Sequence, residues 1–359
     1  MINKIKPIAI YLPQFHPVPE NDNWWGKGFT EWTNVTKAKP EFEGHYQPHL
    51  PADLGFYDLR LEEARLAQEA LAKTYGIHGF CYYHYWFNGK RMLHEPLDRK
   101  LQNPKEDLPF MLCWANENWT RVWDGSESEI LLKQVYSEED DLNHINQLIY
   151  YFKDDRYIKV DGKPIFIIYR LKLFPDLENT IKIWREEVKK AGFPDLYLGF
   201  SQNYDLQFEP TSKGFDFAFE FQPNFGRLPN VYNHNLLKKI KRKIYKKLSK
   251  RFIQKTIYNY SEYSKMQMMQ PFKPNVFPGI TPMWDNTARR KDNAFVLHDS
   301  TPADYKKWLQ HIRNNYPWDN VPENFLFINA WNEWAEGNHL EPCQKWKHQY
   351  LEVTKQILS

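Results

Sequence analysis

Residues 324–337 read NFLFINAWNEWAEG, and this segment is the starting point for the fold prediction. The apolar run 325–328 has the length and composition of a strand that is buried on both faces, as strands of parallel sheets are. Glu333 and Glu336 follow where that strand should end. If the chain turns helical there, their spacing of three places both carboxylates on one face, close enough to share a substrate. The alternative is an ordinary helix start, where the helix dipole favours acidic residues.

Seven further apolar segments lie upstream, and amphipathic helical patterns separate them. The eight strand candidates are residues 5–12, 79–83, 109–113, 164–169, 196–200, 215–221, 276–283 and 325–328. Strands that alternate with helices in this way predict an α/β fold, a single (β/α)8 TIM-type barrel over residues 1–359 with long βα loops. A doubly wound sheet is the alternative, but the chain has no Gly-rich phosphate loop of either standard spacing. Pro278 and Pro282 lie in the seventh candidate, so that strand should be short or irregular.

Residues 223–275 interrupt this alternation and are predicted to be an inserted loop and helix region after the sixth strand. Within it, residues 237–252 are densely basic. Their apolar residues recur at spacings of three and four, which predicts one amphipathic helix. One interpretation is a solvated cationic face on a barrel helix. The other is peripheral contact with an anionic membrane surface, an acidic glycan or a lipid-linked glycan.

The composition favours a carbohydrate site and disfavours several other functions. Aromatic residues make up 17% of the chain, with 14 Trp and 22 Tyr, and such rings stack on sugar faces while their polar edges form hydrogen bonds. An aromatic-rich core is the alternative. A net charge of +3 is too small to make nucleic acid the main partner. Cys81, Cys113 and Cys343 indicate no disulfide framework. Without a secretory signal pattern or an apolar run of membrane-spanning length, a cytoplasmic protein is expected.

In a barrel of this type, functional side chains project from the carboxyl ends of the strands. Polar and aromatic residues cluster at those positions in this sequence, and we predict that they bind substrate. The predicted substrate-binding residues are Tyr11, Gln14, His16, Trp32, Tyr83, His84, Trp86, Trp114, Asn116, Glu117, Trp119, Tyr169, Glu220, Gln222, Trp284, Asp285, Trp331, Asn332 and Trp334. Glu333 and Glu336 are the predicted catalytic pair, since two carboxylates between aromatic walls suit acid–base chemistry on a sugar. Trp331 and Trp334 are expected to supply those walls.

Several of these residues keep two interpretations. Glu117 is expected to bind sugar hydroxyls, and a role as a third catalytic carboxylate is the alternative. Asp285 and Glu220 are either substrate ligands or partners in ion pairs at the barrel mouth. Glu31 belongs to a loop that we interpret as part of the site, because no regular periodicity explains its many aromatic rings. No metal and no cofactor is expected, since His, Asp and Glu residues show no metal-type spacing.

Several long motifs, in fixed order, resemble those of the WbsX-type polysaccharide-biosynthesis proteins, a branch related to glycoside hydrolase family 99. The motifs are YLPQFH at 11–16, WWGKGFTEW at 24–32, HYQP at 45–48, GFCYYHYW at 79–86 and WNEWAEG at 331–337. The resemblance extends from about residue 6 to about residue 345, and the basic insertion is its least family-like part. It implies a (β/α)8 barrel that acts on α-mannoside-like substrates, with α-rhamnosides as a further candidate, and that retains the anomeric configuration.

The resemblance also implies roles for the two motif carboxylates. Glu333 would deprotonate the sugar 2-hydroxyl, which displaces the leaving group and forms a 1,2-anhydro intermediate. Glu336 would protonate the leaving oxygen and then activate water. A glycosyltransferase or transglycosylase of cytoplasmic O-antigen or capsular polysaccharide biosynthesis is the second hypothesis, although the chain has no Asp-x-Asp metal motif or nucleotide-binding loop. A non-catalytic glycan-binding barrel is the third.

Overall fold

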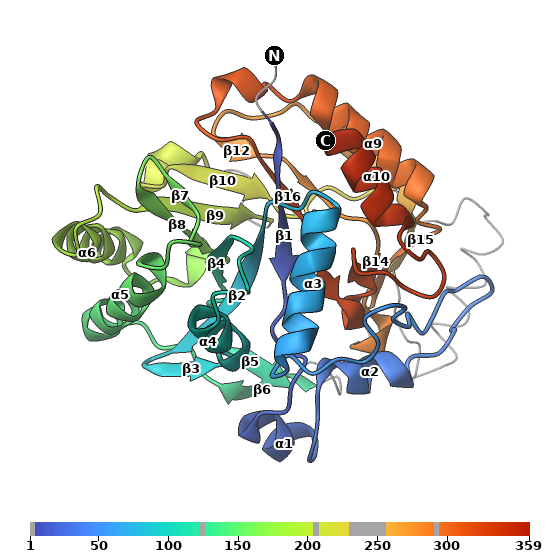
Figure 1. The fold of residues 1–359 in the computed structure, drawn as a ribbon, viewed down its shortest axis with the longest axis horizontal. Coiled ribbons are helices and arrows are strands. Elements are labelled where there is room, and N and C mark those ends of the chain that lie inside the picture. The colour runs from blue at the N-terminus through green and yellow to red at the C-terminus, as the bar shows by residue number, and fades with distance from the viewer. Residues whose placement is uncertain (1–3, 122–125, 204–207, 230–255, 291–293) are drawn as a thin grey trace, which may run out of the picture.

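The computed structural model of the chain describes residues 4–121, 126–203, 208–229, 256–290 and 294–359. Its centre is a nearly closed barrel of parallel strands with helices around it (Figure 1). The strands lie in the order β12-β10-β9-β8-β4-β2-β1-β16-β13. Their bounds are β1 (Lys6–Tyr11), β2 (Gly79–Phe87), β4 (Phe110–Trp114), β8 (Lys163–Ile168), β9 (Tyr197–Gln202), β10 (Phe217–Glu220), β12 (Val276–Phe277), β13 (Gly279–Ile280) and β16 (Phe325–Ile328). The predicted (β/α)8 barrel is confirmed.

The seventh strand is split by Pro278 into two short pieces. β12 pairs with β10 and β13 pairs with β16, so the two pieces bring the edges of the sheet together. The Pro278 carbonyl accepts a hydrogen bond from the Phe327 amide at 3.0 Å. A Cβ atom added at Gly279 would lie 1.7 Å from the Glu220 carbonyl oxygen, so only glycine permits this close approach of the two strands. The expected short and irregular strand is therefore present.

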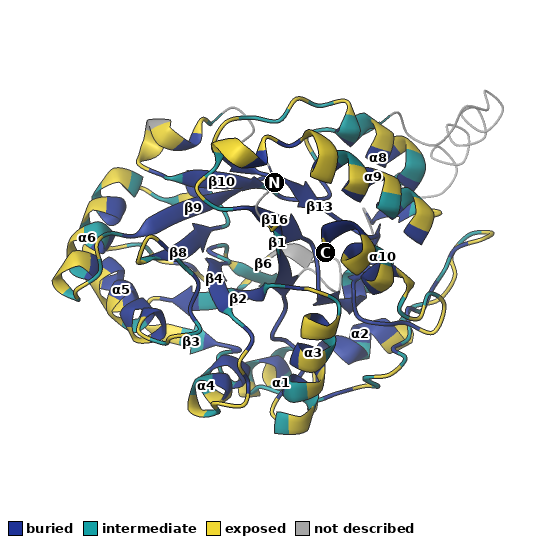
Figure 2. Cartoon of the chain, turned by 45° about the horizontal axis from the view of Figure 1, so that its top comes forward, coloured by how far each residue is buried: buried dark blue, intermediate teal, exposed yellow. Residues whose placement is uncertain are grey.

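Most helices cover the outside of the barrel, with their buried faces toward the strands and their exposed faces toward solvent, while the first two belong to the loop after β1 (Figure 2). They are α1 (Pro19–Trp25), α2 (Glu31–Lys37), α3 (Glu62–Thr74), α4 (Glu95–Gln102), α5 (Glu138–Phe152), α6 (Leu177–Lys190), α8 (Tyr260–Met268), α9 (Pro302–Asn315) and α10 (Gln349–Leu358). α5 packs against α6, and α9 packs against α10. None of the helices in the described ranges combines the length and the apolar character that crossing a membrane requires.

Most of the short strands lie in the βα loops, and one, in a hairpin with the start of β8, lies at the opposite end of the barrel. They are β3 (Lys90–Met92), β5 (Trp119–Arg121), β6 (Ser126–Leu132), β7 (Lys159–Val160), β11 (Thr256–Asn259), β14 (Trp284–Asp285), β15 (Phe295–His298), β17 (Asn332–Glu333) and β18 (Asn338–His339). β11 pairs with β15 and leads directly into α8, so the end of the predicted insertion 223–275 returns to the barrel. The predicted basic helix at 237–252 lies outside the described residues.

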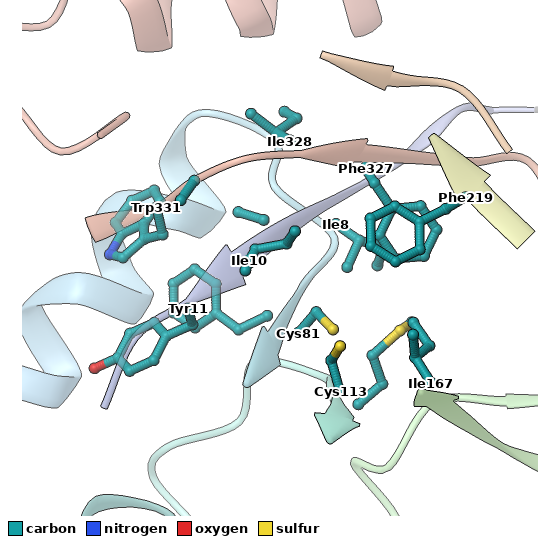
Figure 3. Close-up of a cluster of buried hydrophobic side chains, with 14 of the residues drawn as sticks. Ile8, Ile10, Tyr11, Cys81, Cys113, Ile167, Phe219, Phe327, Ile328 and Trp331 are labelled. Carbon is teal, nitrogen blue, oxygen red and sulfur yellow. The ribbon is translucent and has the colours of Figure 1, made fainter. Parts of the chain in front are cut away.

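The barrel interior is filled by apolar side chains from successive strands. Ile8, Cys81, Cys113 and Ile167 point toward one another in Figure 3, and the Phe219 ring stacks on another interior ring. All four residues of β16 are at most 1% exposed, as expected for a strand buried on both faces. Burying one large apolar side chain contributes about 1.5–3 kcal/mol, so this packed interior is a rigid base for the loops above it.

Candidate active site

A cavity of about 1060 Å³ opens at the carboxyl ends of the barrel strands. Pockets with convergent polar groups at this end of a barrel are where such folds place their active sites. The cavity brings together several of the predicted site residues, contributed by different strands and loops. Those that border it are Gln14, Tyr83, Glu117, Trp119, Tyr169, Trp284, Glu333 and Glu336.

The segment after β16 presents both motif carboxylates to this cavity. β17 is followed by a single 3-10 turn, Trp334–Glu336, rather than by the α-helix start considered from the sequence. Gly337 then adopts a left-handed conformation with φ of 53°. A Cβ atom there would lie 2.9 Å from the Asp285 backbone oxygen, so this position requires glycine on two grounds. The chain thus leaves this turn in close contact with the loop that follows the seventh strand.

Arg289 connects the two motif carboxylates, and nothing in the sequence analysis had singled it out. Its Nη2 lies 2.9 Å from Glu333 Oε2 and its Nη1 lies 2.8 Å from Glu336 Oε1. Its Nε lies 2.6 Å from Oε1 of Glu31, the first residue of α2. A lone arginine has no sequence spacing that relates it to carboxylates in other loops, so the sequence carries no pattern from which to find it. Arg290 also borders the cavity.

The electrostatics of this cluster favour retention of a proton. Burial raises the pKa of Glu333, Arg289 lowers it, and the nearby carboxylates Glu336 and Glu31 raise it further. Burial raises the pKa of Glu336 as well, against the opposing effect of Arg289. Three carboxylates around one guanidinium leave an excess of negative charge, and low polarity makes that excess costly. A largely buried pair that holds a proton near neutral pH is suited to general acid–base chemistry.

Another carboxylate–guanidinium pair lies at the loops after β4 and β8. Arg170 Nη1 donates to Glu117 Oε1 at 2.7 Å, and both residues border the cavity. Asn116 stands behind this pair, because its side chain exchanges two hydrogen bonds of 2.8 Å with the Arg170 backbone. Burial raises the pKa of the Glu117 carboxyl, and Arg170 lowers it. The pair therefore offers both a donor and an acceptor to a polar ligand.

Aromatic rings form much of the remaining wall. Tyr83 and Tyr169 meet edge to face with ring centroids 6.1 Å apart. The Tyr85 ring lies 5.2 Å from the Trp119 ring, and Tyr136 also borders the cavity. Tyr85 and Tyr136 were not among the predicted residues, although Tyr85 lies within a quoted motif and shares strand parity with Tyr83. Rings with polar edges around an open cavity are suited to stacking on sugar faces.

Strand alternation directs four predicted residues away from the cavity and toward the helices. The Tyr11 hydroxyl donates to Gln68 of α3 at 2.8 Å. On β2, His84 lies 3.0 Å from a histidine of α5, and Trp86 Nε1 donates to an α5 carboxylate at 2.9 Å. Trp114, at the end of β4, packs edge to face on the same α5 histidine. Successive side chains of a strand point to opposite faces, so neighbours of cavity residues are buried behind them.

Four more predicted residues, Asn332, Trp334, Trp331 and Trp32, also lie outside the cavity lining. Their buried contacts hold the loops around the cavity. Asn332 exchanges hydrogen bonds with the Leu12 backbone, Trp334 Nε1 donates to Glu341, and Trp331 packs on an aromatic ring of β2. Trp32 Nε1 donates to the Tyr57 carbonyl. These side chains tie the carboxylate-bearing turn to α2, β2 and the loop after β1. Trp331 and Trp334 do not border the cavity, and their role as low-polarity walls around the carboxylates stays a prediction.

Four others have separate surroundings. Asp285 Oδ2 lies 2.6 Å from Nε2 of His45, a contact of the kind expected in the second of its interpretations. Gln222 accepts a hydrogen bond from the hydroxyl of an α8 tyrosine. Burial raises the pKa of Glu220 to about 7 at the end of β10. His16 is fully buried, and burial lowers its pKa to about 4. Within the described ranges, no cluster of three or more His, Cys, Asp or Glu side chains is arranged to hold a metal ion.

Comparison with solved structures shows a shared fold. A "Glycoside hydrolase-like protein" superposes with a TM-score of 0.58 at 13% identity and covers 100% of this chain and 95% of its own. The GH99 endo-alpha-mannosidase from Bacteroides thetaiotaomicron also gives a TM-score of 0.58 at 13% identity, over 98% of this chain and 96% of that chain. At 13% identity, this similarity shows that the chains share the barrel fold, and it shows the fold alone.

Sequence relatives place the chain more closely. A protein described as "Uncharacterized protein WxcX" from Xanthomonas campestris pv. campestris strain B100 is 39% identical over 357 residues. The aligned region is 98% of this chain and 49% of that protein, so the chain spans about half the length of the curated relatives it matches. The family model described as "Glycosyltransferase WbsX" matches residues 7–354. With almost the whole barrel and both motif carboxylates inside that match, the chain belongs to the WbsX family.

Proposed function

We propose that residues 1–359 form one catalytic domain, a retaining carbohydrate-active enzyme for α-mannoside-like linkages of a bacterial-type polysaccharide. An endo-α-mannosidase-like glycoside hydrolase is the preferred form of this proposal, with α-rhamnosides as alternative substrates. The observation that carries it is the pair Glu333, which is buried, and Glu336, which is partly buried, at the carboxyl end of a barrel, where both border a cavity with aromatic walls. The fold shared with a GH99 endo-alpha-mannosidase supports it.

The proposed reaction uses the two carboxyl groups in turn. Glu333 removes the proton from the sugar 2-hydroxyl, and the 2-oxygen attacks C1 as the bond to the leaving oxygen breaks. Glu336 donates its proton to that leaving oxygen. Glu336 then accepts a proton from water as the water attacks C1, and the opened 2-oxygen recovers its proton from Glu333. Two inversions at C1 give net retention, and the excess negative charge around Glu333 and Glu336 suits a pair that exchanges protons in this way.

A glycosyltransferase or transglycosylase of O-antigen or capsular polysaccharide biosynthesis is the second candidate. The description of the matched family as a glycosyltransferase favours it. A transferase of this kind would use the same cavity but deliver the sugar to an acceptor hydroxyl instead of water. A non-catalytic glycan-binding barrel is the third candidate, and it would need the aromatic walls but not the proton-holding pair.

Product release from α-linked mannose and rhamnose oligosaccharides tests the proposal. The wild type, Glu333→Gln and Glu336→Gln are compared with and without nucleotide sugars, and NMR follows the anomer that first appears. We expect cleavage without nucleotide, retained configuration, and a loss of about 10²–10⁴-fold in either variant, since a general acid or base contributes that much. Glu352→Gln, on the exposed face of α10, is the matched control and should keep full activity. Transfer that requires a nucleotide sugar would replace the hydrolase by the transferase.

We also propose a cytoplasmic location, which the three free, buried cysteines support. Contact between residues 237–252 and an anionic membrane or a lipid-linked glycan is a further proposal, supported by the sequence of that segment. Charge reversal at Lys241, Arg242 and Lys246 should weaken binding to anionic liposomes and acidic glycans. Equal binding by the wild type and the reversed variant would contradict the membrane proposal.

A further inference from the structure

Glu31 is a fully buried carboxylate that does not border the cavity and yet belongs to its charge cluster. It begins α2, whose first turn is held by a capping box and by the Glu31 amide, which donates to the Gln14 carbonyl at 3.2 Å. α2 packs directly on the turn that carries the motif carboxylates, where the Trp32 and Trp334 rings lie 5.6 Å apart. Glu31 therefore stands on a fixed support behind the site.

Each of the three nitrogens of the Arg289 guanidinium faces a different carboxylate. Nε faces Glu31, Nη2 faces Glu333 and Nη1 faces Glu336, at 2.6, 2.9 and 2.8 Å. A guanidinium is a planar and rigid fork, so three partners on three nitrogens fix its plane and its rotation. The partners come from the loops after the first and eighth strands, and Arg289 comes from the loop after the seventh. The Arg289 side chain thus connects the three loops that follow the first, seventh and eighth strands.

We propose that Glu31 and Arg289 are a positioning pair, which holds Glu333 and Glu336 in a fixed relation and controls how the two share charge. The role in turnover rests on the proposed function, because it matters only if Glu333 and Glu336 carry the reaction. Glu31 anchors the guanidinium from the buried side, and Arg289 presents its two remaining nitrogens to the catalytic pair. Without Glu31, the guanidinium would keep its charge but lose the contact that orients it.

The two members of the pair should act on the catalytic carboxyls with opposite sign. Removing the Glu31 charge removes its repulsion of the other two carboxylates, and Arg289 then interacts with Glu333 and Glu336 alone. The pKa values of Glu333 and Glu336 should therefore fall. Removing the Arg289 charge takes away the attraction, so both pKa values should rise. The other groups that face the cluster are Arg290, which lowers the pKa of Glu336, and Tyr83 and Tyr85 of β2. They are unchanged in either variant.

Carbon-13 NMR of protein labelled at the glutamate carboxyl carbon measures these titrations directly. Glu333→Gln and Glu336→Gln assign the two signals. In Glu31→Gln we expect both to titrate about one pH unit lower than in the wild type, and in Arg289→Met about one unit higher. Arg289→Lys keeps the charge but not the fork, so it should titrate near the wild type while kcat falls. Glu117→Gln removes a different cavity carboxylate and should leave both titrations unchanged.

Shifts in the same direction for Glu31→Gln and Arg289→Met, or no shift in either, would overturn the proposal. If Glu31→Gln does not fold, Glu31→Asp replaces it: with the charge kept and the reach shortened, we expect wild-type titrations with reduced kcat, and unchanged kcat would overturn the positioning role. Failure of the proposed function is separate. A wild type that cleaves no tested glycan refutes the hydrolase, while the titrations still decide whether Glu31 and Arg289 control the charge of the pair.

Discussion

Glu341 is a buried carboxyl directly behind the catalytic turn, and its replacement by glutamine gives a sharp test of how that turn is held. Its Oε2 accepts hydrogen bonds from Trp334 Nε1 at 2.6 Å and from the Tyr57 hydroxyl at 2.8 Å. Its Oε1 accepts one from Gln68 Nε2 at 2.6 Å. Trp334 lies between the two motif carboxylates in the sequence, so Glu341 ties the turn to the loop after β1 and to α3.

The magnitude follows from burial and from the hydrogen bonds. Burial raises the pKa of Glu341 from 4.5 to about 7, while its hydrogen bonds lower it. Between these values the unfolded chain has lost the proton that the folded chain still holds, so stability falls as the pH rises. At about 1.4 kcal/mol per pH unit, the wild type loses about 3.5 kcal/mol across this range. Glu341→Gln cannot titrate, but its amide NH₂ faces at least one donor, which costs about 1–3 kcal/mol.

The variant should therefore be less stable than the wild type by about 1–3 kcal/mol near pH 4.5, and near pH 8 this deficit should be gone or reversed, with the variant more stable by up to about 2 kcal/mol. Guanidinium denaturation followed by tryptophan fluorescence measures both free energies of unfolding at each pH. The other buried carboxyl groups titrate in both proteins, so their contributions to the pH dependence cancel in the difference between the two free energies of unfolding. Glu352→Gln, at an exposed position, should stay within about 0.5 kcal/mol of the wild type at every pH. A Glu341→Gln deficit that does not change with pH would refute the reasoning.

Three further outcomes are expected. Phe219→Ala opens a hole in the barrel interior where its ring stacks on Phe327, and should lower the free energy of unfolding by about 3–5 kcal/mol in denaturant titrations; a loss below 1 kcal/mol would contradict the packing. Trp119→Ala should raise KM because the ring borders the cavity, whereas Trp86→Phe should lower Tm and leave KM unchanged; equal effects on KM would contradict the strand parity. Gly337→Ala should cost about 1–3 kcal/mol through its left-handed φ and close contact, seen as a lower Tm.

The barrel was predictable because its evidence is local. The run 325–328 was expected to be a buried strand, and β16 covers Phe325–Ile328. Pro278 and Pro282 predicted that the seventh strand would be short or irregular, and it is split at Pro278. Hydrophobic periodicity is set by each segment's own geometry, so it can be read without knowing the partners of that segment. The polar and aromatic clusters after the strands likewise indicated the end of the barrel where the cavity lies.

The lining of the cavity depended on tertiary structure. Tyr83 borders it and His84 does not, because side chains of a strand alternate and only closure of the barrel decides which parity faces inward. The charge cluster around Arg289 could not be predicted from the sequence either, since Glu31 and Arg289 are 258 positions apart. The sequence by itself determined the barrel strands, the helices that alternate with them and the pair of motif carboxylates, through patterns local to each segment; it did not show α1 and α2, which lie in the segment interpreted as an irregular loop. Only the folded chain brought three loops to one guanidinium, because contacts between distant segments leave no period in the sequence.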